Sequence, residues 1–359
     1  MKHILAVLCF LALPLSAQQY KMAVVSGLHS HVWAPLKQAL NSDQVKFVGF
    51  AETLPELVAQ AKKTGVPDNL IFADYKKMIE ETKPDFVWAF TETYRHLEVV
   101  QFCAPRGIHV IVEKPLAATY AQALEIQKLA LKYKINVLTN YSSTWQASNY
   151  AVKAAVDAGA IGPVYRMRAV VGHGGPGDPK KSPFVAWLAD PVKNGGGAMV
   201  DFGCYSMLWS IWMKGMPESV YTSVLHLKPE TYPKVEDNAT IILNYKDGVA
   251  IFEGSWALPP RPPSGNEIFG RTGSIVMGRP IELRKAGGRG QQEPEQIKVD
   301  PLPPERSNAI AYMVNRISTK QPLEGMTALD IHIQVQEVLE AAKISVKTGQ
   351  AVRLPLKAK

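Results

Sequence analysis

Short apolar runs alternate with amphipathic segments through the first 140 residues. The apolar runs predict strands, and the segments between them carry apolar residues at three- to four-residue spacing, which predicts helices. Regular alternation of this kind indicates an α/β domain with a doubly wound parallel sheet of the Rossmann type over residues 18–140. The predicted strands are 21–26, 45–51, 69–73, 85–90, 109–112 and 136–139, and the predicted helices are 31–40, 55–64, 75–82, 94–106 and 120–133.

From residue 141 onward the apolar positions alternate with a period of two. After a helix at 147–158, this pattern predicts strands at 164–172, 219–228, 238–245, 249–258, 267–270, 273–277 and 281–284. A helix at 198–213 interrupts them, and late helices at 304–319 and 327–347 are expected to pack back across the chain. We therefore expect a C-terminal α+β domain over 141–359, built on an open, mainly antiparallel sheet.

The chain begins with Met1-Lys2-His3, an apolar run over 4–15 and then Ser16-Ala17. This order predicts a cleavable signal peptide over 1–17, and hence a periplasmic or secreted protein. The run is too short to cross a bilayer, and no later stretch reaches the roughly 20 apolar residues that a spanning helix needs. No membrane span is expected.

Composition narrows the classes of partner. The 359 residues carry a formal charge of +8, but the basic residues are scattered, so we expect no nucleic-acid partner and a small-molecule ligand instead. The eight histidines are dispersed apart from His29 and His31, so we expect no metal site.

Candidate nucleotide-binding residues follow the first strands. The turn at 26–31 contains only Gly27 of the usual three glycines, with His29 and Ser30 as further hydrogen-bonding groups, and by itself it is also consistent with a plain strand-to-helix turn. Glu52 follows the second strand, where a carboxylate accepts ribose hydroxyls and repels a 2′-phosphate, which favours NAD over NADP. The alternative is a carboxylate at the N-terminus of the next helix, ahead of Leu54. Thr91, after the fourth strand, is expected to line the same groove.

The fifth predicted strand ends in Glu113-Lys114-Pro115. Lys114 would face the crevice where ligands of such sheets bind, and burial is expected to lower the pKa of its amine so that it can exchange a proton. Glu113 and Asn140, at the ends of the fifth and sixth strands, complete the candidate cofactor-binding set with Lys114 itself.

The glycine run at 195–197 precedes a helix on which Asp201 and Tyr205 lie four residues apart and so share one face. Together with a lysine they could orient a sugar hydroxyl and move its proton. An equally open alternative is that Asp201 bonds nearby backbone and Tyr205 packs as an aromatic. His173, in a glycine-rich loop, and Trp187 are candidate substrate contacts, with loop placement and core packing as their alternatives.

Glu113-Lys114-Pro115 and the glycine-rich segment leading to Asp201 together give the chain a resemblance to the Gfo/Idh/MocA oxidoreductases. The resemblance implies a Rossmann domain that binds NAD or NADP and a C-terminal sheet that holds a sugar-like substrate and forms homo-oligomer contacts. It also implies Lys114 as the catalytic lysine, Asp201 as the acid that orients the substrate and Tyr205 as the proton acceptor, its phenolate stabilised by Lys114.

These expectations combine into a sugar oxidoreductase. Because free NAD is scarce outside the cytoplasm, an exported enzyme is expected to keep its cofactor bound and to recycle it within the catalytic cycle. Two alternatives stay open at this point. One is a redox-neutral, NAD-dependent glycosidase, and the other is a non-catalytic sugar-binding protein, suggested by the glycine-poor turn.

Overall fold

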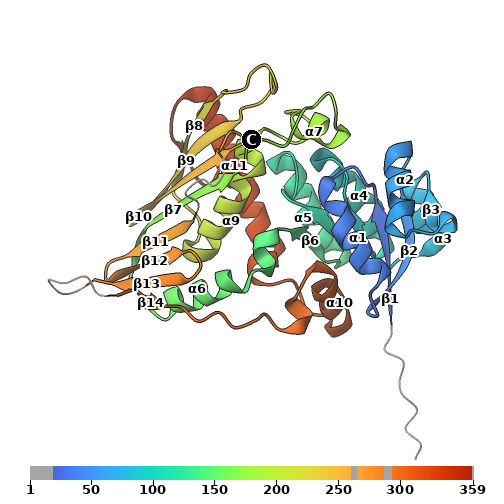
Figure 1. The fold of residues 1–359 in the computed structure, drawn as a ribbon, viewed down its shortest axis with the longest axis horizontal. Coiled ribbons are helices and arrows are strands. Elements are labelled where there is room, and N and C mark those ends of the chain that lie inside the picture. Colours follow the sequence, from blue (N-terminus) through green and yellow to red (C-terminus); the bar gives the residue numbers. More distant parts are fainter. Residues whose placement is uncertain (1–18, 260–264, 287–292, 358–359) are drawn as a thin grey trace, which may run out of the picture.

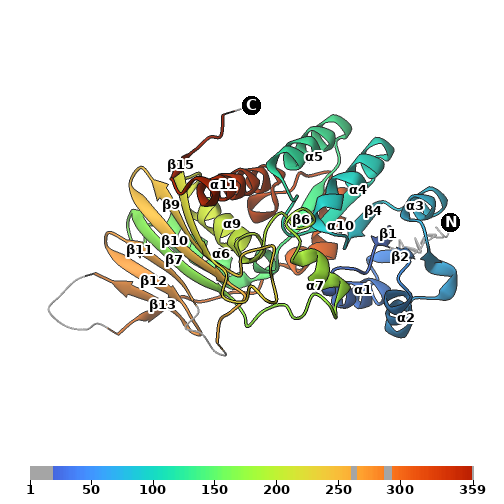
Figure 2. The same cartoon turned by 90° about the horizontal axis from the view of Figure 1, so that it is seen from above.

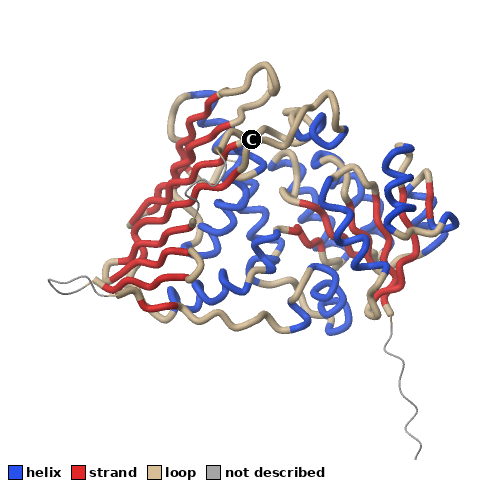
Figure 3. The backbone as a smooth tube through the Cα atoms, viewed as in Figure 1, coloured by secondary structure: helices blue, strands red, loops and turns tan. Residues whose placement is uncertain are grey.

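The computed structural model describes residues 19–259, 265–286 and 293–357. Two sheets stand side by side with helices packed between them (Figures 1 and 3). The predicted signal peptide lies outside the described residues. Among the residues described, no helix combines the length and the apolar character needed to cross a membrane.

The first sheet has six parallel strands in the order β3-β2-β1-β4-β5-β6. This order reverses direction between β1 and β4, as in a doubly wound nucleotide-binding fold, so the carboxyl ends of these strands flank a crevice. The predicted α/β sheet is confirmed. Its strands are β1 (Tyr20–Val25), β2 (Val45–Ala51), β3 (Ile71–Phe72), β4 (Phe86–Ala89), β5 (His109–Glu113) and β6 (Val137–Asn140).

Helices cover both faces of this sheet, which explains why its strands are apolar throughout. Met22 and Phe50 face one side with residues of α10 (Ala309–Thr319), whereas Val25 and Val110 face the other. The crossover helices are α1 (Trp33–Leu40), α2 (Pro55–Thr64), α3 (Tyr75–Thr82), α4 (His96–Cys103) and α5 (Tyr120–Tyr133). Thr119 precedes α5, and its side chain accepts a hydrogen bond from the backbone N–H of Gln122, so it caps this helix.

The second sheet has nine strands in the order β14-β13-β12-β11-β7-β10-β9-β8-β15. It is mainly antiparallel as expected, but β10 pairs with β7 in parallel. Its strands are β7 (Val164–Gly172), β8 (Ser219–Leu225), β9 (Asn238–Tyr245), β10 (Gly248–Ser255), β11 (Asn266–Gly270), β12 (Gly273–Met277), β13 (Ile281–Lys285), β14 (Glu295–Gln296) and β15 (Val352–Arg353).

Among the described residues, helices cover one face of this sheet. Helices α6 (Ala147–Asp157), α9 (Gly203–Lys214) and α11 (Leu329–Thr348) pack on it, between the two sheets (Figure 2). The single helix predicted over 198–213 is interrupted at Phe202, which separates α8 (Ala198–Asp201) from α9. At this point the helix lies tightly against the sheet, since a Cβ added at Gly203 would come within 2.8 Å of the Ile241 side chain. The short helix α7 (Pro183–Leu188) was not expected from the sequence.

Candidate active site

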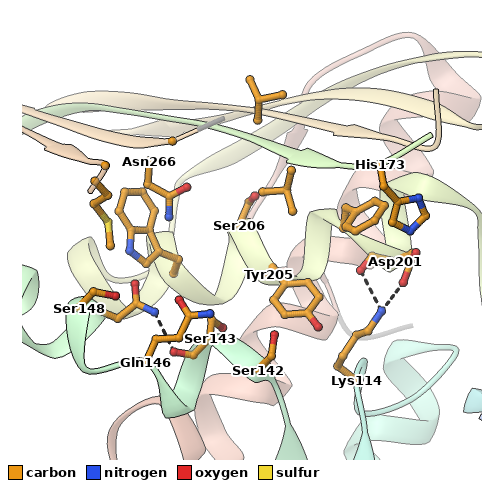
Figure 4. A pocket seen from close by; sticks show the side chains of 18 of the residues that line it. Lys114, Ser142, Ser143, Gln146, Ser148, His173, Asp201, Tyr205, Ser206 and Asn266 are labelled. Atoms are coloured by element: carbon orange, nitrogen blue, oxygen red, sulfur yellow. Dashed lines mark hydrogen bonds and ion pairs between the residues drawn. The ribbon is translucent and has the colours of Figure 1, made fainter. Parts of the chain in front are cut away.

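A buried ion pair joins the two halves of the molecule. Lys114, just after β5, donates from Nζ to the Asp201 carboxylate and, at 3.2 Å, to the Asp201 carbonyl oxygen (Figure 4). The second carboxylate oxygen of Asp201 accepts the indole N–H of Trp256 at 2.9 Å. The Lys114 and Asp201 side chains are only 6% and 8% exposed, so the structure brings together two of the predicted catalytic residues away from bulk water.

Glycines and one carboxylate position Asp201. Gly195 adopts a φ of +92°, and a Cβ at Gly197 would lie 2.0 Å from the Glu236 carbonyl oxygen, so neither position accommodates a side chain without a shift. Glu236 accepts the N–H groups of Gly197 and Met199 at 2.8 and 3.0 Å and thereby fixes the start of α8. The sequence pattern indicated Glu236 only as the solvated start of a strand and did not single out Trp256, because no local pattern marks a partner that comes from a distant strand.

The charges at this pair differ from the expectation. Burial opposes the charge on Lys114, but attraction to Asp201, Tyr205 and Cys204 outweighs it and raises the pKa of the amine. Burial likewise opposes the Asp201 carboxylate, yet Lys114 and Trp256 hold the pKa of that group below its usual value. The prediction of a lowered lysine pKa was therefore wrong, since it counted desolvation without the buried counter-ion.

Tyr205 lies beside the ion pair. The Lys114 Nζ is 5.3 Å from the centre of its ring, and the ring of Tyr141 meets it edge-on at 5.1 Å. Burial raises the pKa of Tyr205 to about 12, although Lys114 acts in the opposite direction. The phenol is thus neutral near pH 7, and the expected phenolate is not favoured in this arrangement.

All three side chains line one cavity of about 1430 Å³ between the domains. Hydroxyl and amide side chains extend along it from Tyr205, supplying donors and acceptors that suit a polyhydroxylated ligand (Figure 4). They are Ser142, Ser143, Gln146, Ser148, Asn149, Ser206 and Asn266.

The two predicted substrate contacts have different positions. His173 lines the cavity, and its Nδ1 accepts the N–H of Gly175 at 3.0 Å, so the neutral ring carries its proton on Nε2. Burial lowers the pKa of His173 and favours this neutral form. Trp187 is instead a core residue, 2% exposed, that packs in a cluster with Trp256 and Tyr232, so its predicted sugar-stacking role is not supported.

The backbone N–H groups of the turn after β1 form hydrogen bonds within the protein. Gly27 donates its N–H to Glu52 at 2.8 Å, and the Ser26 hydroxyl donates to the same oxygen at 3.0 Å. The N–H of Leu28 is taken by the Ser26 hydroxyl and that of His29 by the Phe90 carbonyl oxygen. These groups would otherwise be available to a phosphate.

The turn also shows which residues replace the glycines of a dinucleotide-binding pattern. Ser26, directly after β1, has a φ of +67°, the conformation that the first glycine of such a turn relieves. Counted from Ser26, the second and third glycine positions fall on Leu28 and His31. Gly27 is therefore not one of the pattern glycines, contrary to the sequence interpretation.

Three other predicted cofactor residues are engaged within the protein. Thr91 is fully buried, and its hydroxyl donates to the Glu92 carbonyl oxygen at 3.2 Å. The fully buried carboxylate of Glu113 accepts the side-chain N–H of Asn140 at 2.9 Å and faces His31. Of the predicted set, His29, Ser30 and Lys114 line the cavity.

Two family models match the chain and together span more than half of it. Residues 25–141 match one described as an oxidoreductase family with an NAD-binding Rossmann fold, and residues 150–276 match the GFO/IDH/MocA C-terminal domain.

Curated relatives and solved structures agree with this match. The trans-1,2-dihydrobenzene-1,2-diol dehydrogenase of Xenopus tropicalis is 28% identical over 48% of this chain and 50% of its own length. The myo-inositol 2-dehydrogenase of Thermotoga maritima is 24% identical over 57% of this chain and 59% of its own. The chain thus spans between half and three-fifths of these two relatives. The aldose-aldose oxidoreductase of Caulobacter crescentus, solved with glycerol, superposes with a TM-score of 0.78 at 20% identity, over 94% of this chain and 100% of that one, which shows a shared fold.

Proposed function

Because the chain belongs to the GFO/IDH/MocA oxidoreductase family, we propose that it oxidises or reduces one carbon of a sugar-like substrate at the Lys114–Asp201–Tyr205 centre with the help of NAD(P). The observation that carries the proposal is the convergence of these three side chains, from both halves of the molecule, at one end of a cavity rich in hydroxyl and amide groups.

The size of the cavity bears on the substrate class. At about 1430 Å³ it exceeds the roughly 300–1,000 Å³ of ordinary small-molecule sites. Part of this space, lined by His29, Ser30 and Lys114, would hold the nicotinamide end of the cofactor, and we propose that the rest holds a glycoside or an oligosaccharide end. The polar side chains beyond Tyr205 would bind the second sugar unit.

We propose that the carboxyl edge of the first sheet binds the two ends of NAD(P). Glu52 follows β2, the position from which a carboxylate accepts ribose hydroxyls in this type of fold, so we propose NAD as the preferred form; its oxygens accept hydrogen bonds from Ser26, Gly27, Thr53 and Leu54 in this structure. Lys114, which lines the cavity, would face the nicotinamide end. When bound, the nicotinamide provides the hydride acceptor or donor.

The Lys114–Asp201 ion pair would stabilise negative charge on the substrate oxygen that reacts. The Lys114 ammonium, kept charged by Asp201, would donate a hydrogen bond to that oxygen and stabilise the negative charge that develops as its proton leaves. Tyr205, neutral and beside the ion pair, would accept the proton of this oxygen while it releases its own phenolic proton to water in the cavity, and the reverse transfer would accompany reduction. The N–H at Nε2 of His173 would hold a neighbouring hydroxyl.

Nucleotide binding tests the proposal. Purified protein is denatured, the supernatant is analysed by mass spectrometry for NAD(H) and NADP(H), and fresh protein is titrated with each nucleotide by calorimetry. The proposal includes export and internal recycling of a tightly held cofactor, so released NAD(H) is the expected result. Neither release nor binding at millimolar nucleotide would refute it.

That refuting outcome would support a second candidate, a sugar-binding protein without a nucleotide. The observation that favours it is the turn after β1, where the N–H groups of Gly27, Leu28 and His29 are all bonded within the protein. Sugar binding unaffected by NAD would distinguish it.

A further inference from the structure

Two imidazoles and a carboxylate converge where the turn after β1 meets the end of β5. His29, His31 and Glu113 each offer one ligand atom, and these atoms all lie within 4.8 Å of one another. The Nδ1 of His31 is 3.0 Å from Glu113 Oε2. Because Glu113 is 82 residues beyond His31 in the sequence, spacing alone gave no sign of this cluster, and no metal site was expected.

The carboxylate of Glu113 is buried and oriented. Its Oε1 accepts two hydrogen bonds, from the indole N–H of Trp88 at 3.2 Å and from the Asn140 amide at 2.9 Å. Oε2 is left to face His31. A ligating carboxylate whose other oxygen is held by partners outside the ligand set is a usual arrangement around a protein-bound metal.

The ring of His29 is fixed as well. Its Nδ1 accepts the backbone N–H of His31 at 3.2 Å, so Nε2 is the nitrogen left to bind a metal. Phe184 and Trp187 pack against the ring, with centroids 4.9 and 5.6 Å away. His29 is therefore held in one orientation, whereas His31 lies at the surface and can adjust.

We propose that His29, His31 and Glu113 bind one divalent transition-metal ion of the Zn²⁺ type. Two neutral imidazoles and one carboxylate carry a net charge of −1 and form a ligand set that suits Zn²⁺ and leaves a coordination position open. Metal–ligand bonds of about 2.0–2.1 Å around a tetrahedral ion place the ligand atoms about 3.3 Å from one another. The three ligand atoms in this cluster lie within 4.8 Å of one another, so small side-chain movements would bring them to that separation.

The open position has a defined neighbourhood. His29 and His31 line the same cavity as Lys114, so the remaining ligands would be water or an oxygen of the molecule bound there. The ion would lie beside His31, the third glycine position of the nucleotide-binding pattern. In this turn the backbone N–H groups of Gly27, Leu28 and His29 are bonded within the protein. Because His29 and Glu113 also belong to the candidate cofactor-binding set, the ion would share this position with the nucleotide, but metal binding to nucleotide-free protein does not require the proposed sugar reaction.

Metal titration of tag-free protein tests the assignment. After dialysis against a chelator, the chain is titrated with Zn²⁺ by calorimetry, and the bound metal is counted by mass spectrometry. We expect one ion per chain, with the affinity reduced by at least about 100-fold in His31→Gln and Glu113→Gln, since loss of a direct ligand should exceed the effect of a second-shell change. His226→Gln, at an exposed histidine outside the cluster, is the matched control and should bind as the wild type does.

Folding and coordination are checked independently. Circular dichroism shows whether each variant folds, and Zn²⁺ should raise the Tm of the wild type and of His226→Gln but not that of His31→Gln. Co²⁺ in place of Zn²⁺ should give a visible spectrum that His31→Gln lacks. Absence of binding in folded wild type, or equal affinity in all variants, would overturn the assignment. Nucleotide and sugar binding, measured separately, show whether the proposed function fails with it.

Discussion

The pairing of Lys114 with Asp201 predicts a strong energetic coupling. Each side chain is less than a tenth exposed, so removing one partner leaves the other charge buried without compensation. Breaking a buried pair in this way costs about 3–5 kcal/mol of unfolding free energy, whereas replacing both partners is often close to neutral. We therefore expect Lys114→Met and Asp201→Asn to lose about 3–5 kcal/mol each, and the double variant to lose at least about 3 kcal/mol less than their sum.

Urea unfolding of the four proteins at pH 7 measures this coupling. The control pair is Lys77 and Glu81, an exposed ion pair on α3, for which a coupling of about 0.5 kcal/mol or less is expected. If the losses at Lys114 and Asp201 simply add, the two groups do not interact in the folded protein, and the reasoning about the centre fails.

The same pair sets a pH dependence. Since the pKa of Asp201 is lowered on folding, its contribution is present above the unfolded value of about 3.9 and disappears as the pH falls through the folded value. Since the pKa of Lys114 is raised, its contribution is present below about 10.4 and disappears as the pH rises through the folded value. Asp201→Asn should make the acid limb of the wild-type stability profile shallower, with Glu98 and Asp247 accounting for part of what is left, and an unchanged limb would argue against the assignment.

Three further predictions follow from the site. Tyr205→Phe should lower kcat by about 100-fold or more while KM changes little, because general acid–base groups contribute about 10²–10⁴-fold; steady-state kinetics with an unchanged kcat would exclude Tyr205 from the proton path. Gly197→Ala should cost at least about 1–3 kcal/mol in urea unfolding, because the new Cβ would lie 2.0 Å from the Glu236 carbonyl oxygen, and wild-type stability would contradict this. Glu52→Gln should reduce the preference for NAD over NADP in calorimetric titrations, because a neutral amide no longer repels a 2′-phosphate; an unchanged ratio would place that selectivity elsewhere.

The first sheet was predictable because its evidence is local. Apolar runs and helical periodicity define each strand and helix in turn, and the predicted strand at 45–51 and the helices at 55–64 and 120–133 match the observed bounds. The alternation of apolar and polar positions also predicted most strands of the second sheet. It did not give the parallel pairing of β10 with β7, because strand pairing depends on contacts that no single segment encodes.

The sequence was sufficient to identify the residues of the candidate site but not to predict their charge interactions. Lys114, Asp201 and Tyr205 were found from motifs, and the structure places them together. The sign of the Lys114 pKa shift depended on a counter-ion 87 residues away in the chain, and the roles of Trp256 and Glu236 depended on partners 55 and 39 residues away. The first contact exists only once the two domains have packed against each other, and the other two only once the C-terminal half has folded.

Single-turnover oxidation by protein saturated with NAD tests whether the Lys114–Asp201–Tyr205 centre carries out the redox step. Wild type and Lys114→Met are each loaded with NAD to equal occupancy, mixed with a panel of glycosides and monosaccharides, and followed by nicotinamide absorbance. We expect at least one sugar to produce reduced nicotinamide in the wild type and none to do so in Lys114→Met. Equal reduction in both proteins would contradict the role given to the Lys114–Asp201–Tyr205 centre.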